Sequence, residues 1–255
     1  MLPTWWARES GVLSSSDAIR SEIDAEAVGS RLLAHGFTVI DGFLGRRAAA
    51  RIRSEIIAMD RAGRLKLGRL QHGTALNTDA ALRNDRIAFV QPDACAPPLA
   101  AYLGLIDRLR DELARAPELA ERLGGEPDGC NYMAAIYPGG GSRYVKHRDA
   151  LPYKAGRKLT AIYYLNPDWV PAHGGELQLW PEVQGVAKPA VRVAPRSDRL
   201  VLFVSSLEHE VLPAWAPRYA LTTWMFSRRD TAMESLAEDM RQRKVRAACC
   251  ARSRR

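Results

Sequence analysis

The chain has 255 residues, of which 47% are hydrophobic and 26% are charged, values that are ordinary for a globular protein and argue against a disordered, collagen-like or coiled-coil chain. Its formal net charge of +8 comes almost entirely from residues 241–255, which carry seven basic and no acidic side chains. The remaining body is nearly neutral, so we expect no nucleic-acid-binding face and interpret the tail as solvated rather than as a site for an acidic partner or a membrane surface.

The four cysteines contain no CxxC pair, so their spacing indicates neither a disulfide framework nor a structural zinc site. The first residues lack the basic and apolar regions of a signal peptide, and no apolar run is long enough to cross a membrane. We therefore expect a protein of a reducing compartment, cytoplasmic or nuclear, that acts as a monomer without membrane association.

The first half of the chain is expected to supply helices. We expect residues 1–22 to form a flexible N-terminal segment and residues 23–128 to form a helical support. The predicted elements of this support are, in chain order, a helix from Asp24 ended by Gly36, a strand over 37–40, a helix from about Arg46 closed by Gly63, a long loop or loose hairpin over 64–82 and a helix over about 98–115.

From residue 129 the pattern changes to short segments rich in β-branched and aromatic residues between turn signals. The predicted strands cover 132–137, 144–146, 159–165, 176–180, 191–193, 200–204, 209–212 and 219–226. Short strands preceded by helices favour an α+β fold, with an antiparallel barrel or double-sheet jelly roll over 129–229 that completes one domain from residue 23. Residues 230–255 are expected to form a C-terminal helix, with Thr231 as N-cap and Glu234 at N3, followed by the basic tail.

One histidine has a carboxylate two residues further on, in the run His147-Arg148-Asp149. Residues i and i+2 of a strand point to the same face, so a strand here presents an imidazole and a carboxylate together. His209 follows on a predicted strand near the end of the β region. Two imidazoles and one carboxylate form the facial triad of non-haem Fe(II) sites, which leaves three coordination positions open. The tripeptide alone is a weak signal. The alternative therefore stays open that the tripeptide is solvated and that His209 lies on the surface.

A buried cation is predicted nine residues after His209. Arg218 opens a run that is otherwise a buried strand, and Thr222 and Trp224 share its face. A guanidinium inside a barrel is costly unless it meets a carboxylate, and its fork suits a bidentate partner. That partner is either a ligand or an internal acidic residue, and Trp224 is either part of a site or plain core.

These residues lie in stretches that resemble the EGL-nine type prolyl hydroxylases, the oxygen-sensing branch of the prolyl 4-hydroxylases. The resemblance covers about residues 30–228 and is most specific from 131 to 226. The stretches that carry it are, in order, Gly36-Phe-Thr-Val-Ile-Asp41-Gly-Phe43-Leu44-Gly45, Arg83-Asn-Asp85-Arg-Ile87, Tyr137-Pro-Gly-Gly-Gly-Ser-Arg-Tyr144-Val-Lys-His147-Arg-Asp149, Ile162-Tyr-Tyr164-Leu-Asn166-Pro-Asp168-Trp169, Gly174-Gly175-Glu-Leu177, His209-Glu-Val211-Leu-Pro213-Ala and Arg218-Tyr219-Ala-Leu-Thr-Thr-Trp224.

The resemblance implies a double-stranded β-helix core and a dioxygenase that hydroxylates C4 of a prolyl residue in a protein substrate, with succinate and carbon dioxide as co-products. The implied cofactors are Fe(II), 2-oxoglutarate and dioxygen, with ascorbate as reductant. The residues implied for the site are His147, Asp149 and His209 as metal ligands, Arg218 and the Tyr164 hydroxyl for the far carboxylate of 2-oxoglutarate, Tyr137 beside its metal-bound end, and Leu177 and Thr222 lining its pocket.

For a protein substrate with an exposed proline, the resemblance implies contacts with Trp224, Arg157 and Ile87. Asp85 and Arg157 lie on loops that flank the barrel opening in the family. We therefore predict that these two residues form an ion pair that holds loop 64–82 over the proline. The alternative is that Asp85 is a turn residue that faces water.

Three departures from the family pattern concern the substrate more than the iron site. Ala161 stands where the family commonly has a cysteine, Leu151-Pro-Tyr-Lys154 replaces a polar turn after Asp149, and loop 64–82 has no close match. A hypoxia-inducible factor therefore should not be assumed as the substrate.

Two other functions fit a jelly roll. One is a 2-oxoglutarate oxygenase with a different substrate, such as another residue, a free amino acid or an alkylated nucleic acid. Nucleic-acid demethylases of the AlkB type carry a second arginine where this chain has Trp224, and procollagen-type enzymes usually carry lysine in place of Arg218 and need a signal peptide. The other is a non-catalytic metal-binding module, for example with zinc, which would need neither Arg218 nor Tyr164 facing the metal.

Overall fold

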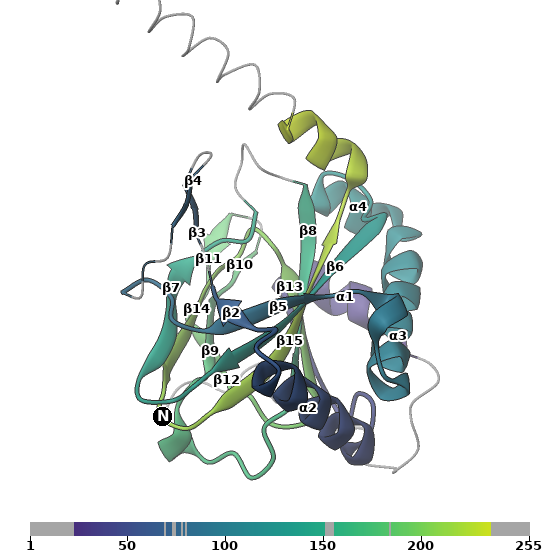
Figure 1. Ribbon diagram of the computed structural model, residues 1–255. Coiled ribbons are helices and arrows are strands. Elements are labelled where there is room, and N and C mark those ends of the chain that lie inside the picture. The colour runs from purple at the N-terminus through teal and green to yellow at the C-terminus, as the bar shows by residue number, and fades with distance from the viewer. Residues whose placement is uncertain are drawn as a thin grey trace, which may run out of the picture.

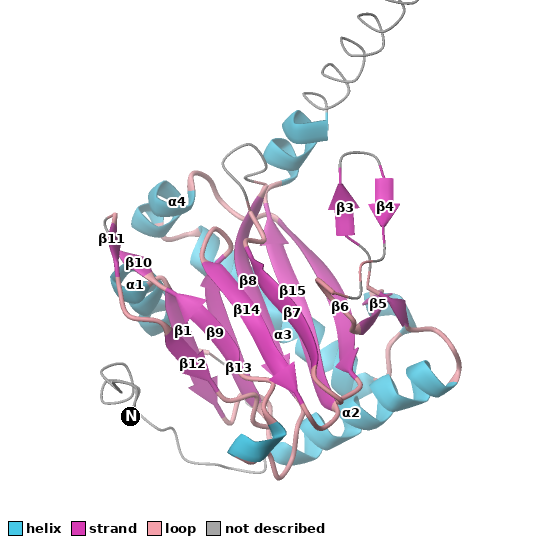
Figure 2. Cartoon of the chain, turned by 90° about the vertical axis from the view of Figure 1, so that its left-hand side faces the viewer, coloured by secondary structure: helices cyan, strands magenta, loops and turns pink. Residues whose placement is uncertain are grey.

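Two antiparallel sheets packed face to face form the centre of the protein, and helices cover the outer side of the larger sheet (Figure 1, Figure 2). The computed structural model describes residues 23–235 except 69, 73–74, 78, 80, 151–155 and 184. The predictions for residues 1–22, for the Leu151–Lys154 turn and for the tail from residue 236 lie outside these residues. The expected α+β architecture, with helices buttressing an antiparallel jelly roll, is confirmed.

The helices lie mainly in the first half of the chain. They are α1 (Ala25–His35), α2 (Arg46–Arg61), η1 (Pro92–Ala94), α3 (Pro97–Ala114), α4 (Pro117–Leu123) and η2 (Pro171–His173). α1 begins after Asp24, whose carboxylate accepts a hydrogen bond from the N–H of Ala27 at 2.9 Å, and ends at Gly36 with φ at 77°. Both ends were predictable, because aspartate caps helix N-termini well and glycine tolerates a positive φ. Within the described ranges, no helix is long and apolar enough to cross a bilayer.

The strands build one large and one small sheet. They are β1 (Phe37–Asp41), β2 (Lys66–Leu67), β3 (Leu70–His72), β4 (Ala75–Asn77), β5 (Arg86–Val90), β6 (Gly129–Tyr137), β7 (Ser142–His147), β8 (Arg157–Tyr164), β9 (Leu177–Trp180), β10 (Glu182–Val183), β11 (Val186–Ala187), β12 (Val191–Val193), β13 (Arg199–Val204), β14 (Glu208–Ala214) and β15 (Arg218–Phe226). The large sheet has the order β1-β13-β8-β15-β6-β5-β2, and the small sheet has the order β12-β9-β14-β7. All eight predicted strand regions are confirmed.

Side chains along β15 alternate between the two faces of the large sheet, as the period of two requires. Thr223 faces the helices, and its hydroxyl lies 3.2 Å from that of Tyr102 on α3. Trp224 faces the small sheet and belongs to a buried cluster that includes residues of β14. The even-numbered residues of β15, which include Arg218, therefore line the interior between the sheets.

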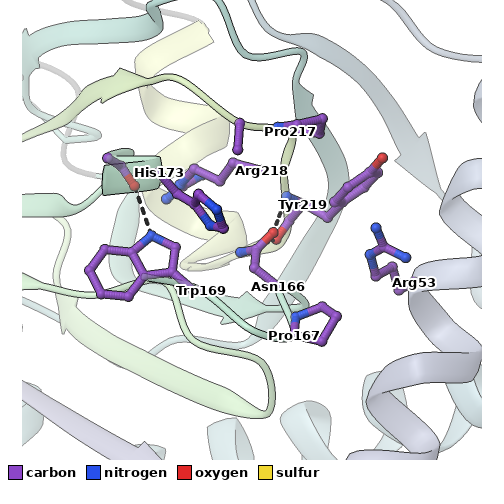
Figure 3. Close-up of a pocket in the computed structure, with 10 residues that line it drawn as sticks. Arg53, Asn166, Pro167, Trp169, His173, Pro217, Arg218 and Tyr219 are labelled. Carbon is purple, nitrogen blue, oxygen red and sulfur yellow. Dashed lines mark hydrogen bonds between the residues drawn. The ribbon is translucent and has the colours of Figure 1, made fainter. Parts of the chain in front are cut away.

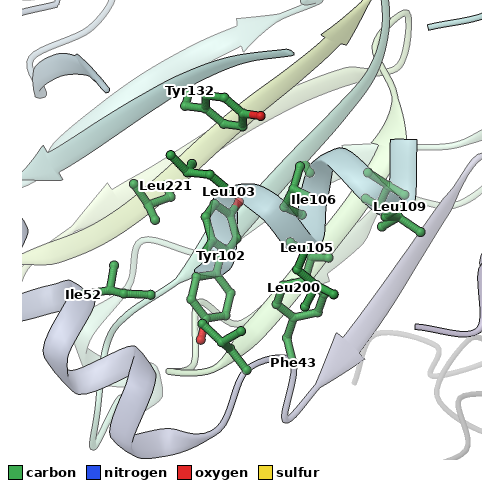
Figure 4. Packing of buried hydrophobic residues seen from close by; sticks show 14 of the residues in the cluster. Phe43, Ile52, Tyr102, Leu103, Leu105, Ile106, Leu109, Tyr132, Leu200 and Leu221 are labelled. Carbon is green, nitrogen blue, oxygen red and sulfur yellow. The ribbon is translucent and has the colours of Figure 1, made fainter. Parts of the chain in front are cut away.

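Two apolar layers hold the large sheet in place. Figure 4 shows the layer between this sheet and the helices, where Tyr102 lies among leucines and isoleucines of several elements. Tyr102 also stacks on Tyr163 of β8, with ring centroids 5.1 Å apart and planes at 19°. A second layer between the sheets includes Tyr164 of β8 and Leu177 of β9. Strands β8 and β15, which carry several candidate site residues, are thus fixed from both sides.

Some elements were not predicted correctly. The helix α4, the strand β5 and the short hairpin β10-β11 were not predicted. In the segment 64–82 the hairpin alternative is correct, because β3 pairs with β4. The last helix begins at residue 228, so the prediction of Thr231 as its N-cap is wrong. Ser227 caps it instead, since its hydroxyl accepts a hydrogen bond from the N–H of Asp230 at 3.3 Å. Glu234 accepts a hydrogen bond from the N–H of Gly156, at the start of β8.

Candidate active site

Strand pairing in the small sheet brings the three predicted metal ligands together. His147 at the end of β7 lies opposite His209 on β14. Asp149 follows β7, and its backbone N–H donates to the carbonyl of Ser205 at 3.0 Å. The Asp149 carboxylate oxygens lie 3.7 Å from His147 Nε2 and 3.6 Å from His209 Nε2, and one ligand atom from each residue falls within 4.8 Å of the others.

Backbone carbonyls fix the orientation of both imidazoles. Nδ1 of His147 lies 2.8 Å from the carbonyl of Val145, and Nδ1 of His209 lies 2.9 Å from the carbonyl of Leu207. Because a carbonyl only accepts, each Nδ1 carries the proton, and each Nε2 lone pair is free for a metal. Burial, reinforced by the neighbouring His209, lowers the pKa of His147 to about 4, so this imidazole is neutral at physiological pH.

Asp149 is held as a carboxylate by its surroundings. The hydroxyl of Thr160 on β8 donates to Asp149 Oδ2 at 2.9 Å and also contacts the hydroxyl of Ser205. The guanidinium of Arg157 lies 3.8 Å from Oδ1. Burial alone would raise the pKa of Asp149, but the two imidazoles and Arg157 together lower it below its ordinary value. The site therefore offers two imidazole nitrogens and one anionic oxygen, the donor set of a facial Fe(II) triad.

Arg218, at the start of β15, is the buried cation of the interior. Its Nε donates to the carbonyl of Gly175 at 2.8 Å, and its guanidinium carbon lies 4.8 Å from the ring centre of Tyr137 and 5.0 Å from that of Tyr164. Gly175 has φ at 72°, and a Cβ there would lie 2.9 Å from the Arg218 side chain. A glycine is thus required for this close approach.

Two polar atoms of this group are buried without a partner. Arg218 Nη2 and the hydroxyl oxygen of Tyr164 make no hydrogen bond of standard geometry with any described residue, although the two groups lie close enough for the guanidinium to oppose the rise in the pKa of Tyr164 that burial causes. Among the described residues, no carboxylate lies within ion-pair distance of Arg218, which argues against the alternative of an internal acidic partner. Since buried polar groups are normally satisfied, this donor pair fits a carboxylate ligand such as the far end of 2-oxoglutarate.

A cavity of about 190 Å³ opens beside Arg218 and is also lined by Arg53, Trp169, His173 and Tyr219 (Figure 3). Its walls are tied together by a hydrogen bond from the N–H of Tyr219 to Asn166 at 2.7 Å. The triad residues do not line it. We call the part of the interior around Arg218 the arginine end and the part around the triad the metal end. The cavity adjoins the arginine end.

The structure places the other predicted cosubstrate residues on the same inner surface. Tyr137 contacts the Arg218 guanidinium as described, and Leu177 is fully buried in the layer that includes Tyr164. Thr222 shares the inward face of β15 and lies opposite Ile162 of β8 in the strand register. Their roles toward a ligand stay predictions, because these positions show where they lie and not what they bind.

Trp224 and Arg157, predicted to meet the substrate, are in contact at the metal end. The Arg157 guanidinium carbon lies 4.0 Å from the ring centre of Trp224, and Ile87 of β5 packs against the cluster that contains Trp224. The indole N–H of Trp224 makes no hydrogen bond of standard geometry with a described residue, but it interacts with the Asp149 carboxylate and helps to lower the pKa of that group. This contact with a predicted metal ligand favours a place in the site over plain core.

The predicted ion pair between Asp85 and Arg157 is wrong. Asp85 is fully buried and accepts two hydrogen bonds from Arg83, at 2.8 and 2.7 Å. Arg157 instead lies beside Asp149 and over Trp224. The physical reason is that Arg83, two residues before Asp85, satisfies both carboxylate oxygens in a bidentate pair. Asp85 is therefore neither a water-facing turn residue nor exposed to a substrate.

The structure brings three further residues to the site that were not predicted. Phe89 is 58% exposed and lies beside Trp224, with ring centroids 6.5 Å apart. Its signal was its position two residues after Ile87 on one strand face. Thr160, whose hydroxyl donates a hydrogen bond to Asp149, could have been predicted, because it lies four residues before Tyr164 on β8 and so shares its face. Tyr144, stacked on His147, gave no such signal.

Comparison with known proteins agrees with this geometry. A family model described as the 2OG-Fe(II) oxygenase superfamily matches residues 132–226. Human prolyl hydroxylase EGLN3 is 34% identical over 204 residues, a match that covers 77% of this chain and 81% of that protein. The chain belongs to the Egl nine family of prolyl hydroxylases. Rat Egl nine homolog 1 is 37% identical over 198 residues, but this chain covers only 55% of it and so spans about half its length.

Solved structures place the chain in the same group. A Trichoplax adhaerens prolyl hydroxylase in complex with a hypoxia-inducible factor oxygen degradation domain peptide is 31% identical, with a TM-score of 0.72 over 82% of this chain and 91% of that one. A Pseudomonas putida prolyl-4-hydroxylase is 29% identical, with a TM-score of 0.67 over 79% of this chain and 98% of that one. Ala161, which stands where the family commonly has a cysteine, faces the helices and not the metal ligands. This departure from the family pattern therefore leaves the site intact.

Proposed function

We propose that this Egl nine family member is an Fe(II)- and 2-oxoglutarate-dependent dioxygenase that hydroxylates C4 of a prolyl residue in a protein substrate, with succinate and carbon dioxide as co-products. One observation carries the proposal: the buried, unpartnered Arg218 Nη2 and Tyr164 hydroxyl occur in the same barrel interior as the His147, Asp149 and His209 triad. Single buried atoms such as the Thr38 hydroxyl also lack a partner among the described residues, but a guanidinium and a hydroxyl left unsatisfied side by side support a carboxylate ligand. Neither a purely structural barrel nor a metal-binding module without 2-oxoglutarate would need this pair.

The residues divide between holding iron and holding the cosubstrate. His147, Asp149 and His209 would hold Fe(II), since their lone pairs and single negative charge suit it. The Arg218 fork and the Tyr164 hydroxyl would bind the far carboxylate of 2-oxoglutarate, with Tyr137, Leu177 and Thr222 shaping the space between. Iron, 2-oxoglutarate and dioxygen supply the oxidising chemistry. The protein contributes orientation of the ligands and an interior that excludes water.

The substrate surface is proposed at the metal end. Trp224 and Phe89 present aromatic faces beside Ile87, which suits the apolar ring of a proline, and the Arg157 guanidinium over Trp224 offers donors to a peptide backbone. The Trichoplax relative binds a peptide of a hypoxia-inducible factor, which supports a proline-containing peptide here without identifying it. Asp85 is removed from the substrate contacts, because its carboxylate is fully buried on Arg83.

The cellular setting is also part of the proposal. Cys95 and Cys130 are free thiols, which suits a reducing compartment such as the cytoplasm. We propose a monomer with ascorbate as the reductant that keeps its iron ferrous, and no role in nucleic-acid or membrane binding.

The test is hydroxylation of a proteome-derived peptide library by the full chain with Fe(II), 2-oxoglutarate and ascorbate in air. Mass spectrometry should find proline-containing peptides one oxygen atom heavier, together with an equal amount of succinate. The Asp149→Asn variant should give neither product. Oxygen incorporated only at residues other than proline would support the rival oxygenase, and no succinate in any reaction would support the binding module.

A further inference from the structure

A buried ion pair lies next to the metal site but touches none of its predicted ligands. Asp85 is 0% exposed and Arg83 is 9% exposed, and they share a bidentate pair. Burial lowers the pKa of Arg83, but the hydrogen bonds and charge of Asp85 outweigh it and raise this pKa above its ordinary value. A buried pair of this kind contributes little net stability, although losing one partner is costly. Its presence therefore suggests a geometric purpose.

The pair contacts the metal site through one aromatic ring. The Arg83 guanidinium carbon lies 4.4 Å from the ring centre of Tyr144. The Tyr144 ring in turn stacks on the His147 imidazole, with centroids 3.7 Å apart and planes at 16°. Since the carbonyl of Val145 fixes Nδ1 of His147 in the ring plane, the Tyr144 stack supplies the restraint perpendicular to that plane. Arg83 thus contacts the same ring that stacks on His147.

An irregularity in β7 makes this stack possible. Tyr144 and His147 are three residues apart, which in a regular strand puts them on opposite faces. Opposite them on β14, however, lie Val211 and His209, which are only two apart, so β7 contains one extra residue. Such a bulge rotates the following side chain to the other face. It therefore places both rings on one side of the sheet.

The backbone around the pair is clamped from two directions. The segment before Asp85 runs along β7, with an N–H···O bond from Val145 to Leu82 at 2.9 Å. On the other side, the N–H of Gly68 donates to the carbonyl of Asp85 at 2.8 Å. A Cβ on Gly68 would lie 2.7 Å from Asp85 Oδ1 and would also overlap the Arg83 side chain. Only glycine lets the segment after β2 close over the pair.

We propose that Arg83 and Asp85 are positioning residues for the metal ligand His147 and act on it through Tyr144. The pair also ties the segment around Gly68, at the start of the predicted substrate loop, to the metal site. This inference rests on the proposed function, because it takes His147 as a metal ligand. Asp85 is thus linked to His147 through Arg83 and Tyr144, and is not paired with Arg157 as predicted.

The test is anaerobic titration of the full chain with Co(II), whose visible absorption reports the coordination geometry, with no 2-oxoglutarate present. Arg83→Lys keeps the charge but loses the fork and the flat face, and Asp85→Asn removes the anchor. Each should weaken Co(II) binding by about 10-fold or more and change the absorption band, as loss of groups that orient ligands does. The matched control is Arg86→Lys, which breaks a similar bidentate pair with Asp60 that has no contact with the metal ligands. It should stay within about two-fold of wild type.

Tyr144 provides the second pair of variants, in case Asp85→Asn does not fold. Tyr144→Phe keeps the stack and should bind Co(II) within about three-fold of wild type, whereas Tyr144→Leu loses it and should resemble Arg83→Lys. Wild-type binding and spectrum in Arg83→Lys and Tyr144→Leu would overturn the inference while leaving the metal site in place. His147→Ala separates the two levels: if it binds Co(II) as wild type does, the proposed metal site itself is wrong.

Discussion

The two ends of the barrel interior are prepared for their ligands in opposite ways. At the metal end, the protein already holds every ligand, since carbonyls bind Nδ1 of His147 and His209 and a hydroxyl binds Asp149. At the arginine end, Arg218 Nη2 and the Tyr164 hydroxyl are buried and make no hydrogen bond of standard geometry within the described part of the chain. The metal end is thus organised before any ligand arrives, whereas we propose that the arginine end is completed by the carboxylate of its ligand.

This difference predicts opposite effects of mutation on function and stability. A buried polar group without a partner costs about 1–3 kcal/mol of folding free energy. The ligand-free protein thus carries a cost at the arginine end that a bound carboxylate relieves. Changes at the metal end should weaken the site with no benefit, and changes at the arginine end should weaken cosubstrate binding while sparing the ligand-free fold.

The largest effect is expected from Asp149→Asn. It removes the only anionic ligand of the triad, so succinate formation should fall by at least about 100-fold, more than loss of a group that only orients a ligand. The measurement is succinate released with saturating 2-oxoglutarate. His173→Ala is the control, because this histidine lies on η2 outside the triad and should leave the rate unchanged. Near wild-type turnover in Asp149→Asn would show that the triad is not the metal site.

Thr160→Val should come next. It keeps the shape of the side chain but removes the donor to Asp149, so the affinity for Mn(II), used in place of iron, should fall about 10- to 100-fold in an electron paramagnetic resonance titration. Thr38→Val is a matched control in the same sheet, since the Thr38 hydroxyl is buried and has no partner among the described residues. Equal Mn(II) affinity in the two variants would contradict the idea that the metal end is organised in advance.

Arg218→Lys sharpens the account of the other end. It keeps the charge but loses the fork, and charge-assisted hydrogen bonds are worth about 1.5–3 kcal/mol, so the KM for 2-oxoglutarate should rise about 10-fold or more. Arg53→Lys alters the other arginine of the adjacent cavity and should leave this KM unchanged. If Arg53→Lys raised the KM and Arg218→Lys did not, the cavity rather than the interior would hold the carboxylate.

Tyr164→Phe should have the smallest effect on function. Loss of one hydrogen bond worth about 0.5–1.5 kcal/mol should raise the KM for 2-oxoglutarate roughly 2- to 10-fold. The ligand-free protein should melt no lower than wild type, because the lost hydroxyl had no partner. In Tyr102→Phe, by contrast, the lost hydroxyl contacts Thr223, so the melting temperature should fall. A clear drop in the ligand-free melting temperature of Tyr164→Phe would show that its hydroxyl is already satisfied.

The sequence predicted what depends on local periodicity and on family motifs. His147 and Asp149 followed from a tripeptide at strand spacing, and the shared face of Arg218, Thr222 and Trp224 followed from the period of two. Only the structure could add how separate strands meet. The contact of Arg157 with Trp224 depends on the pairing of β8 with β15, which no single segment encodes.

Two misses have definite physical causes. Tyr144 was overlooked because a bulge in β7 breaks the period of two that sequence arguments rely on. Asp85 was assigned to Arg157 because charge and loop position alone allow several partners. In the structure, the segment that contains Asp85 lies along β7, and Arg83, two residues away, donates hydrogen bonds to the Asp85 carboxylate. The sequence alone does not show which of several charged loop residues is the partner.

The central claim is that one molecule of 2-oxoglutarate joins the two ends of the interior. Isothermal titration of the full chain with 2-oxoglutarate, without oxygen and with Mn(II) in place of iron, tests it directly. We predict that removing the metal or changing Arg218 to lysine each weakens binding by about 10-fold or more, and that 2-oxoglutarate tightens Mn(II) binding by the same factor by which Mn(II) tightens 2-oxoglutarate binding. Equal 2-oxoglutarate affinity with and without the metal would contradict the account.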